Sequence, residues 1–126
     1  MRSLVVLLIT VSLFVCVAPA NAEQPTARVL TLEQWQWVHR WFPERELSMA
    51  RTTWCESNFR DEMVGANGEI GRLQIMPIHA WRLGFTPSDL HDPEINGYIG
   101  SLILAERPDG SAWTLYNGCK EWDYGS

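Results

Sequence analysis

The sequence predicts a mainly α-helical fold: a single small domain of about five helices with at most a short β-hairpin. Apolar residues recur at helical spacing in several segments, and capping residues or prolines stand where those segments begin and end. The length of 126 residues suits one domain rather than two. A turn-rich stretch at residues 57–71 leaves room for the hairpin.

Residues 1–22 have the order of a secretory signal peptide. Arg2 gives a positive start, an apolar run extends from Leu4 to Val17, and Ala20-Asn21-Ala22 places small residues at a cleavage site. The apolar run is 14 residues long, shorter than the roughly 20 that span a bilayer. We therefore expect a secreted or periplasmic protein with no stable membrane anchor after cleavage.

The expected mature chain, residues 23–126, is acidic. Its 9 Lys/Arg stand against 15 Asp/Glu, a formal charge of −6. A chain with one lysine, Lys120, is poorly suited to neutralise phosphates, so nucleic-acid binding is disfavoured. Residues 23–30 are expected to form a loose segment ahead of the domain at 31–126. The three histidines have no ligand spacing to one another or to the cysteines, so no metal or cofactor is expected.

A capping box begins the first expected helix. Thr31 and Gln34 have the spacing of that motif, and Pro43 ends the helix. We expect Trp35 and Trp41 in the core, with Trp37 at the edge of the apolar face. That face is formed by Leu32, Trp35, Val38, Trp41 and Phe42.

The second expected helix spans about residues 44–56 and ends at a glutamate. Leu47, Ala50 and Trp54 form one apolar stripe that is predicted to face the core. Glu56 lies on the other side of the helix, on a face that suits the wall of a cleft. Three more helices are expected: a short one from Met76-Pro77, a longer one from Asp92-Pro93, and a last short one through residues 111–117.

Two cysteines remain in the mature chain, because Cys16 leaves with the signal peptide. In an exported protein an even pair indicates a disulfide between Cys55 and Cys119. Their separation of 64 positions gives a stabilisation of about 4 kcal/mol on the chain-entropy model. The alternative is two free buried thiols.

Three short segments, residues 55–57, 71–77 and 115–119, hold the residues that could do chemistry. Each is a weak signal alone, because a glutamate that ends a helix is more often a solvated surface charge. Trp113 and Trp122 lie near these segments and are candidates for stacking on sugars, although such rings more often build a core.

Taken in order, the segments resemble the soluble lytic transglycosylase family of the lysozyme superfamily. Glu56-Ser57 matches the family's helix-ending Glu-Ser, and Gly71 to Gln74 matches its Gly-Leu-Met-Gln-type turn. Tyr116-Asn117 matches its Ala-Tyr-Asn-type motif, with Leu115 in place of Ala. The resemblance covers roughly residues 45–119. A departure is Ile103, where the family often has Tyr.

A second resemblance is to resuscitation-promoting factors, which are small secreted relatives. They too place a Cys just before the catalytic Glu and another after the last helix. This resemblance supports a Cys55–Cys119 bridge that pins the helix of Glu56 to the segment of Tyr116.

The resemblance implies an α+β lysozyme-like domain at residues 31–126 that acts on peptidoglycan as a monomer without a cofactor. It implies cleavage of the β-1,4 bond between N-acetylmuramic acid and N-acetylglucosamine, with 1,6-anhydromuramyl ends. Glu56 would act as general acid and then as base, with Tyr116 orienting the bond. The implied substrate-binding residues are Ser57, Gln74, Met76, Tyr116 and Asn117.

Several functions remain open from the sequence. A hydrolytic muramidase on the same fold would need a second carboxylate roughly 5–9 Å from Glu56. The candidates nearest in sequence are Asp61, Glu62 and Glu69, and none falls on a family motif. A non-catalytic peptidoglycan-binding module would not need the acid. A small disulfide-bridged protein that acts on protein partners is supported only by size and export.

Overall fold

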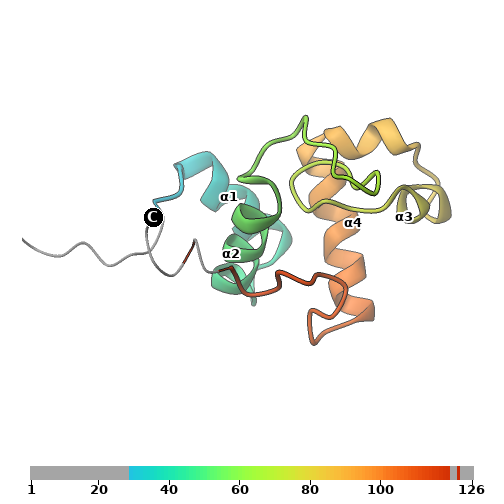
Figure 1. Cartoon of the computed structure of the whole chain (residues 1–126). Helices are drawn as coiled ribbons and strands as arrows, with labels where there is room; N and C mark the ends of the chain where they lie inside the picture. The colour runs from blue at the N-terminus through green and yellow to red at the C-terminus, as the bar shows by residue number, and fades with distance from the viewer. Residues whose placement is uncertain (1–28, 120–121, 123–126) are drawn as a thin grey trace, which may run out of the picture.

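The computed structural model describes residues 29–119 and residue 122; the expected signal peptide and most of the expected loose segment lie outside them. The described part holds four α-helices and one 3-10 helix: α1 (Leu32–Trp41), α2 (Glu46–Ser57), α3 (Pro77–Arg82), η1 (Pro87–His91) and α4 (Pro93–Glu106). Figure 1 shows α4 between the α1–α2 pair and α3. The prediction of a small, mainly α-helical domain is confirmed. In place of a hairpin, isolated antiparallel bridges join Val64 to Ile70 and Ile70 to Ile75.

The capping box of α1 is confirmed, but the buried face of this helix differs from the prediction. The Thr31 backbone N–H donates to Gln34 Oε1 at 2.9 Å, and the Gln34 N–H donates to Thr31 Oγ1 at 3.2 Å. Trp37 is 1% exposed, whereas Trp35 is 36% exposed and Trp41 is half-buried. Trp37 is drawn inward because α4 packs against its side of α1, where its Nε1 donates to Pro93 O at 2.7 Å.

The predicted core stripe of α2 is wrong at Leu47, which is 51% exposed. The helix instead buries Met49 and Ala50 together with Thr52 and Thr53. The two threonine hydroxyls donate to the carbonyls of Ser48 and Met49, one turn earlier, at 2.7 and 2.6 Å. Polar side chains can enter the core in this way because their hydrogen bonds are made inside their own helix. The side of α2 that was expected to form a cleft wall is therefore largely core.

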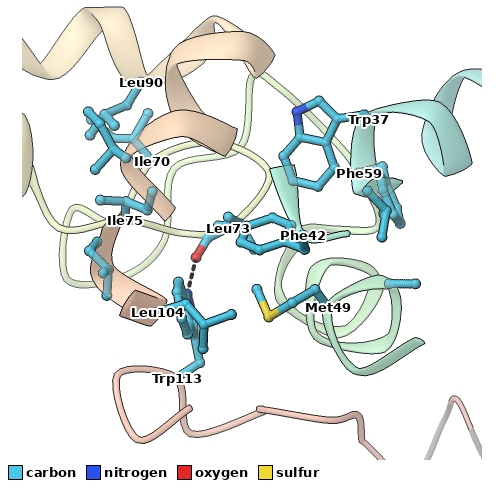
Figure 2. Packing of buried hydrophobic residues seen from close by; sticks show 14 of the residues in the cluster. Trp37, Phe42, Met49, Phe59, Ile70, Leu73, Ile75, Leu90, Leu104 and Trp113 are labelled. Atoms are coloured by element: carbon cyan, nitrogen blue, oxygen red, sulfur yellow. Dashed lines mark hydrogen bonds between the residues drawn. The ribbon is translucent and has the colours of Figure 1, made fainter. Parts of the chain in front are cut away.

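A turn at residues 70–74 lies in the middle of the core. Leu73 is fully buried, and Figure 2 shows it beside Phe42, with the indole of Trp113 reaching its carbonyl. That bond, from Trp113 Nε1 to Leu73 O, is 2.9 Å long. Asn96 of α4, also fully buried, accepts from the Leu73 N–H at 3.0 Å and donates to Ile70 O and Leu90 O at 3.0 and 2.9 Å. One amide thus joins α4, η1 and the turn.

The last expected helix, residues 111–117, is wrong. The segment after α4 is a series of turns that leads back to α2 (Figure 1). Trp113 anchors this segment in the core, and the Asn117 N–H donates to Thr52 Oγ1 at 2.9 Å. The predicted Cys55–Cys119 disulfide is confirmed and holds its end against α2. These anchors outweigh the helical tendency of a short segment, which is weak without packing on one face.

The Asn96 side chain provides a test of this arrangement. Replacement by alanine, Asn96→Ala, removes the partner of the buried Leu73 N–H and of Leu90 O, while Ile70 O keeps its bond from the Ile75 N–H, so we expect a loss of about 3 kcal/mol in the free energy of unfolding. Urea denaturation followed by circular dichroism measures it. Asn67→Ala, at an exposed asparagine, is the matched control and should change stability by less than about 0.5 kcal/mol. Equal stability of the two variants would show that Asn96 does not hold the core together.

Candidate functional site

The end of α2 forms one wall of a pocket of about 440 Å³. The helix stops there because Asn58 adopts the left-handed conformation, with φ 55°, and caps Trp54 O through its N–H. Glu56 lies in the last turn and is half-buried. The pocket is lined by Trp54, Cys55, Glu56, Asn58, Arg60, Met63, Leu115 and Cys119.

The carboxyl group of Glu56 has an unusual affinity for its proton. Its pKa is raised from an ordinary 4.5 to about 7. Burial is the largest cause, the negative charge of Glu69 adds to it, and a hydrogen bond from the Leu115 backbone N–H opposes the shift. Burial disfavours the ionised form because the charge loses its water, and a like charge adds to this cost. Near neutral pH the group can therefore both give and take a proton.

The other two carboxylates considered from the sequence are placed differently. Asp61 Oδ1 accepts from Arg72 Nε at 2.7 Å, and this ion pair occupies it. Glu62 is exposed to solvent. Glu69 is therefore the carboxylate that the structure couples to Glu56.

Ser57 lies next to Glu56 in sequence, but its side chain is directed into the core. Its hydroxyl donates to Arg72 O at 2.7 Å and is buried, so it joins the end of α2 to the 70–74 turn. Gln74, in that turn, has a φ of 49° and is 8% exposed. Its Nε2 donates to Gly71 O at 2.9 Å and to Met63 O at 3.2 Å, which ties the turn to the pocket wall.

Met76 is exposed and shares with Gln74 a second, smaller hollow of about 50 Å³, next to His79 and Trp113. Trp113 and Trp122 are buried at 7% and 2% exposure, so both rings belong to the core and neither is free to stack on a sugar. Of the two aromatic candidates for sugar contact, the structure thus leaves none at the surface.

The Tyr116 hydroxyl is held by Arg45, whose backbone lies at the opposite end of α2 from Glu56. It accepts from Arg45 Nη1 at 2.7 Å, at the start of α2. Arg45 precedes Glu56 by 11 positions, about 16 Å along a helix. The ring of Tyr116 lies against Gly110, where a Cβ would overlap it. The neighbouring Leu115 contacts Glu56 instead, through its backbone.

Asn117 is exposed, and its backbone is held by Thr52. The pocket also contains residues that the sequence analysis did not single out: Asn58, Arg60 and Met63. Proximity to Glu56 in the sequence is the signal that could have found them, since all three follow within seven positions. Their part in the pocket depends on how the chain folds back after α2.

In the part of the chain that the structure describes, no three His, Cys, Asp or Glu side chains gather as a metal site would require. Among the same residues, no helix is long and apolar enough to cross a membrane.

Comparison with known proteins identifies a family. Residues 46–115, 70 of the 126, match the family described as transglycosylase SLT domain. The match begins with the first residue of α2 and ends at Leu115, so it includes Glu56, the 70–74 turn and α4. No curated protein and no solved structure matched the chain in the same comparisons.

The effect of the Glu69 charge on the pKa of Glu56 can be measured directly. In Glu69→Gln we expect the pKa of Glu56 to fall from about 7, though not to 4.5, because burial is the larger cause of the shift. A carbon-13 NMR titration of the glutamate side chains reports this value. Glu62→Gln is the control for loss of an exposed charge in the same loop and should leave the pKa of Glu56 unchanged. An unaltered pKa in Glu69→Gln would show that the two groups do not interact.

Proposed function

The chain belongs to the transglycosylase SLT domain family, and from this premise we propose that it cleaves the β-1,4 bond between N-acetylmuramic acid and N-acetylglucosamine in peptidoglycan, leaving 1,6-anhydromuramyl ends. Membership implies peptidoglycan as the substrate and lytic transglycosylase activity in general. The observation that carries the proposal is Glu56, a half-buried carboxyl in an open pocket with a pKa of about 7.

In the first step, protonated Glu56 donates its proton to the glycosidic oxygen while the bond from that oxygen to the muramyl C1 breaks. The N-acetyl group of the sugar stabilises the positive charge on C1, as in substrate-assisted glycosidases. In the second step, the muramyl 6-hydroxyl attacks C1, and its proton passes to the Glu56 carboxylate. The acid is thereby restored, and no water is consumed.

A pKa near 7 suits this double use. A group that holds its proton too weakly would be ionised before the first step, and one that holds it too strongly would be a poor base in the second. A module that only binds glycan would gain nothing from a carboxyl in this state, since burying it costs free energy. The catalytic reading is therefore favoured over a non-catalytic binding module.

The surroundings of Glu56 hold it in position. The Leu115 N–H contacts the carboxylate, and the Cys55–Cys119 disulfide keeps that segment against α2. We assign Gln74, Met76 and Asn117 to contacts with the glycan. Ser57 acts by joining α2 to the turn of Gln74, and Tyr116 acts by fixing the segment of Leu115 through its bond to Arg45.

The disulfide and the peptidoglycan-directed family indicate an extracytoplasmic protein. Together with the signal-peptide pattern at residues 1–22, this leads us to propose a secreted or periplasmic location.

Glu56→Gln tests the central assignment. The amide cannot donate the required proton, so we expect turnover of purified peptidoglycan to fall by at least about a hundredfold. Mass spectrometry of the products measures this, and wild-type products should be one water lighter than simple hydrolysis products. Glu62→Gln serves as the matched control and should digest peptidoglycan at the wild-type rate.

The folded state of Glu56→Gln can be verified independently. The raised pKa means that the folded wild type holds this proton more tightly than the unfolded chain, so wild-type stability falls as pH rises from 4.5 to about 7. Glu56→Gln does not lose stability over this pH range, because its amide does not titrate. After a discount for solvent screening, we expect it to be about 1 kcal/mol more stable than wild type at pH 8. A well-folded variant with wild-type turnover would contradict the role of Glu56.

The pH dependence follows from the same group. Glu56 must be protonated in the free enzyme for the first step, so kcat/KM should decline about tenfold per pH unit above the Glu56 pKa of about 7. A pH–rate profile on soluble glycan fragments measures it. A decline that began near pH 4.5 would mean that Glu56 is not the acid, or that its burial does not persist in solution.

A further inference from the structure

Arg60 is the one cationic side chain among the described residues that line the pocket of Glu56. Apart from Arg60 and Glu56, the described lining residues are uncharged. When Glu56 is protonated, as the first step of the proposed reaction requires, this lining therefore carries a single positive charge, although the chain as a whole is acidic. A positive pocket in an acidic protein favours a negatively charged ligand.

The Arg60 side chain is held in place by the loop that follows α2. Its Nε donates to Ser57 O at 2.9 Å, and its Nη2 donates to Met63 Sδ at 3.3 Å. The Arg60 backbone N–H donates to the same Ser57 O at 3.2 Å, which closes a turn. The two side-chain contacts use the Nε–Nη2 edge of the guanidinium. Its Nη1 makes no hydrogen bond within the described residues, so the Nη1–Nη2 edge is left for another acceptor.

Among the residues that the structure describes, no carboxylate pairs with Arg60. Arg72 and Arg82, by contrast, are each paired with carboxylates of this chain. Asp61, the next residue after Arg60, is already engaged by Arg72. The positive charge of Arg60 also does not counter the raised pKa of Glu56, where the opposing cause is the backbone of Leu115. Arg60 is therefore an ordered, unpaired cation in the pocket, set apart from the acid.

The substrate of the proposed function carries carboxylates close to the bond that is cleaved. Muramic acid differs from glucosamine by a lactyl ether on its 3-oxygen, and this group ends in a free carboxylate when no peptide is attached. Where a stem peptide is attached, the lactyl carbonyl forms an amide and the peptide supplies carboxylates of its own. The planar fork of a guanidinium matches the two oxygens of a carboxylate. The free edge of Arg60 thus suits the group by which the muramyl unit differs from its neighbour.

We propose that Arg60 binds a carboxylate on the lactyl substituent of the muramyl unit, either the lactyl carboxylate itself or one of the stem peptide, and so makes the enzyme select glycan that bears this charge. The proposal rests on the proposed function, since it concerns how the same pocket recognises its substrate. Arg60 binds the substituent and takes no part in proton transfer. Glycan whose carboxylates are neutralised would leave the guanidinium without this partner, so charged glycan is cleaved more efficiently than uncharged glycan.

The test uses soluble glycan fragments of two kinds, one with stem peptides and one without. Each kind is prepared with its carboxylates free and, by carbodiimide coupling, as uncharged methylamides. The value of kcat/KM on the free form, divided by that on the methylamide, gives a preference ratio for each protein. The ratio is used rather than the rate, because a general disturbance of the loop would lower both values together. Wild type is compared with Arg60→Gln, and Arg107→Gln, at an exposed arginine just after α4, is the matched control for loss of a positive charge.

We expect wild type and Arg107→Gln to prefer the free carboxylate by about fivefold or more, and Arg60→Gln to bring the ratio close to one. The fragment that shows the effect identifies the source of the carboxylate: the lactyl group in the peptide-free fragment, the stem peptide in the other. Raising the salt concentration from about 0.05 to about 0.5 M should reduce the wild-type preference, because screening weakens an ion pair at an exposed side chain. Circular dichroism confirms that each variant is folded.

Other outcomes separate the two proposals. A wild-type ratio near one on both fragments, an equal ratio in wild type and Arg60→Gln, or a preference that salt does not change overturns the role of Arg60 and leaves the proposed function intact. A wild type that yields no more product than Glu56→Gln overturns the proposed function.

Arg60 is tested in that case by binding alone. Isothermal titration calorimetry compares the affinity of Glu56→Gln for the free and methylamide fragments with that of the double variant Glu56→Gln/Arg60→Gln. Tighter binding of the free carboxylate by Glu56→Gln, lost in the double variant, supports Arg60 as the carboxylate-binding residue. Equal affinities for the two forms in Glu56→Gln overturn it.

Discussion

The buried turn at residues 70–74 must satisfy its backbone polar groups without a sheet or a helix, and the arrangement of the other elements follows from how it does so. An unpaired buried N–H or carbonyl costs about as much as a lost hydrogen bond. Side chains from three distant segments supply the partners: Asn96 from α4, Ser57 from α2 and Trp113 from the segment after α4. Each bond also fixes the position of the element that provides it.

This constraint places the candidate site. The turn carries Gln74, whose amide reaches the loop of Met63, and the same turn is bonded to the end of α2 beside Glu56. On the other side, the disulfide and Trp113 hold the last segment so that the Leu115 N–H meets the carboxylate. Glu56 therefore lies between elements that are bonded to one another. The burial that this arrangement imposes is the largest cause of its raised pKa.

Arg72 holds two of the nearby carboxylates in ion pairs. It is buried, lies over the rings of Trp37 and Phe59, and pairs with Asp61 and with Glu33 of α1. A buried guanidinium requires such partners, because leaving it unpaired would be far more costly. Asp61 is therefore engaged in the ion pair with Arg72, and Glu69 is left as the carboxylate whose charge acts on Glu56.

The sequence by itself determined the features that depend on groups a few residues apart. The capping box of Thr31, the start of α4 at Asp92-Pro93 and the position of Glu56 at the end of α2 follow from local hydrogen bonds and steric limits, and the two cysteines pair as expected. The tertiary structure alone decided which face of α1 is buried, the turns in place of a helix at residues 111–117, and the partners of Tyr116 and Glu69. These outcomes depend on packing and charge from segments far apart in the chain, which local periodicity does not contain.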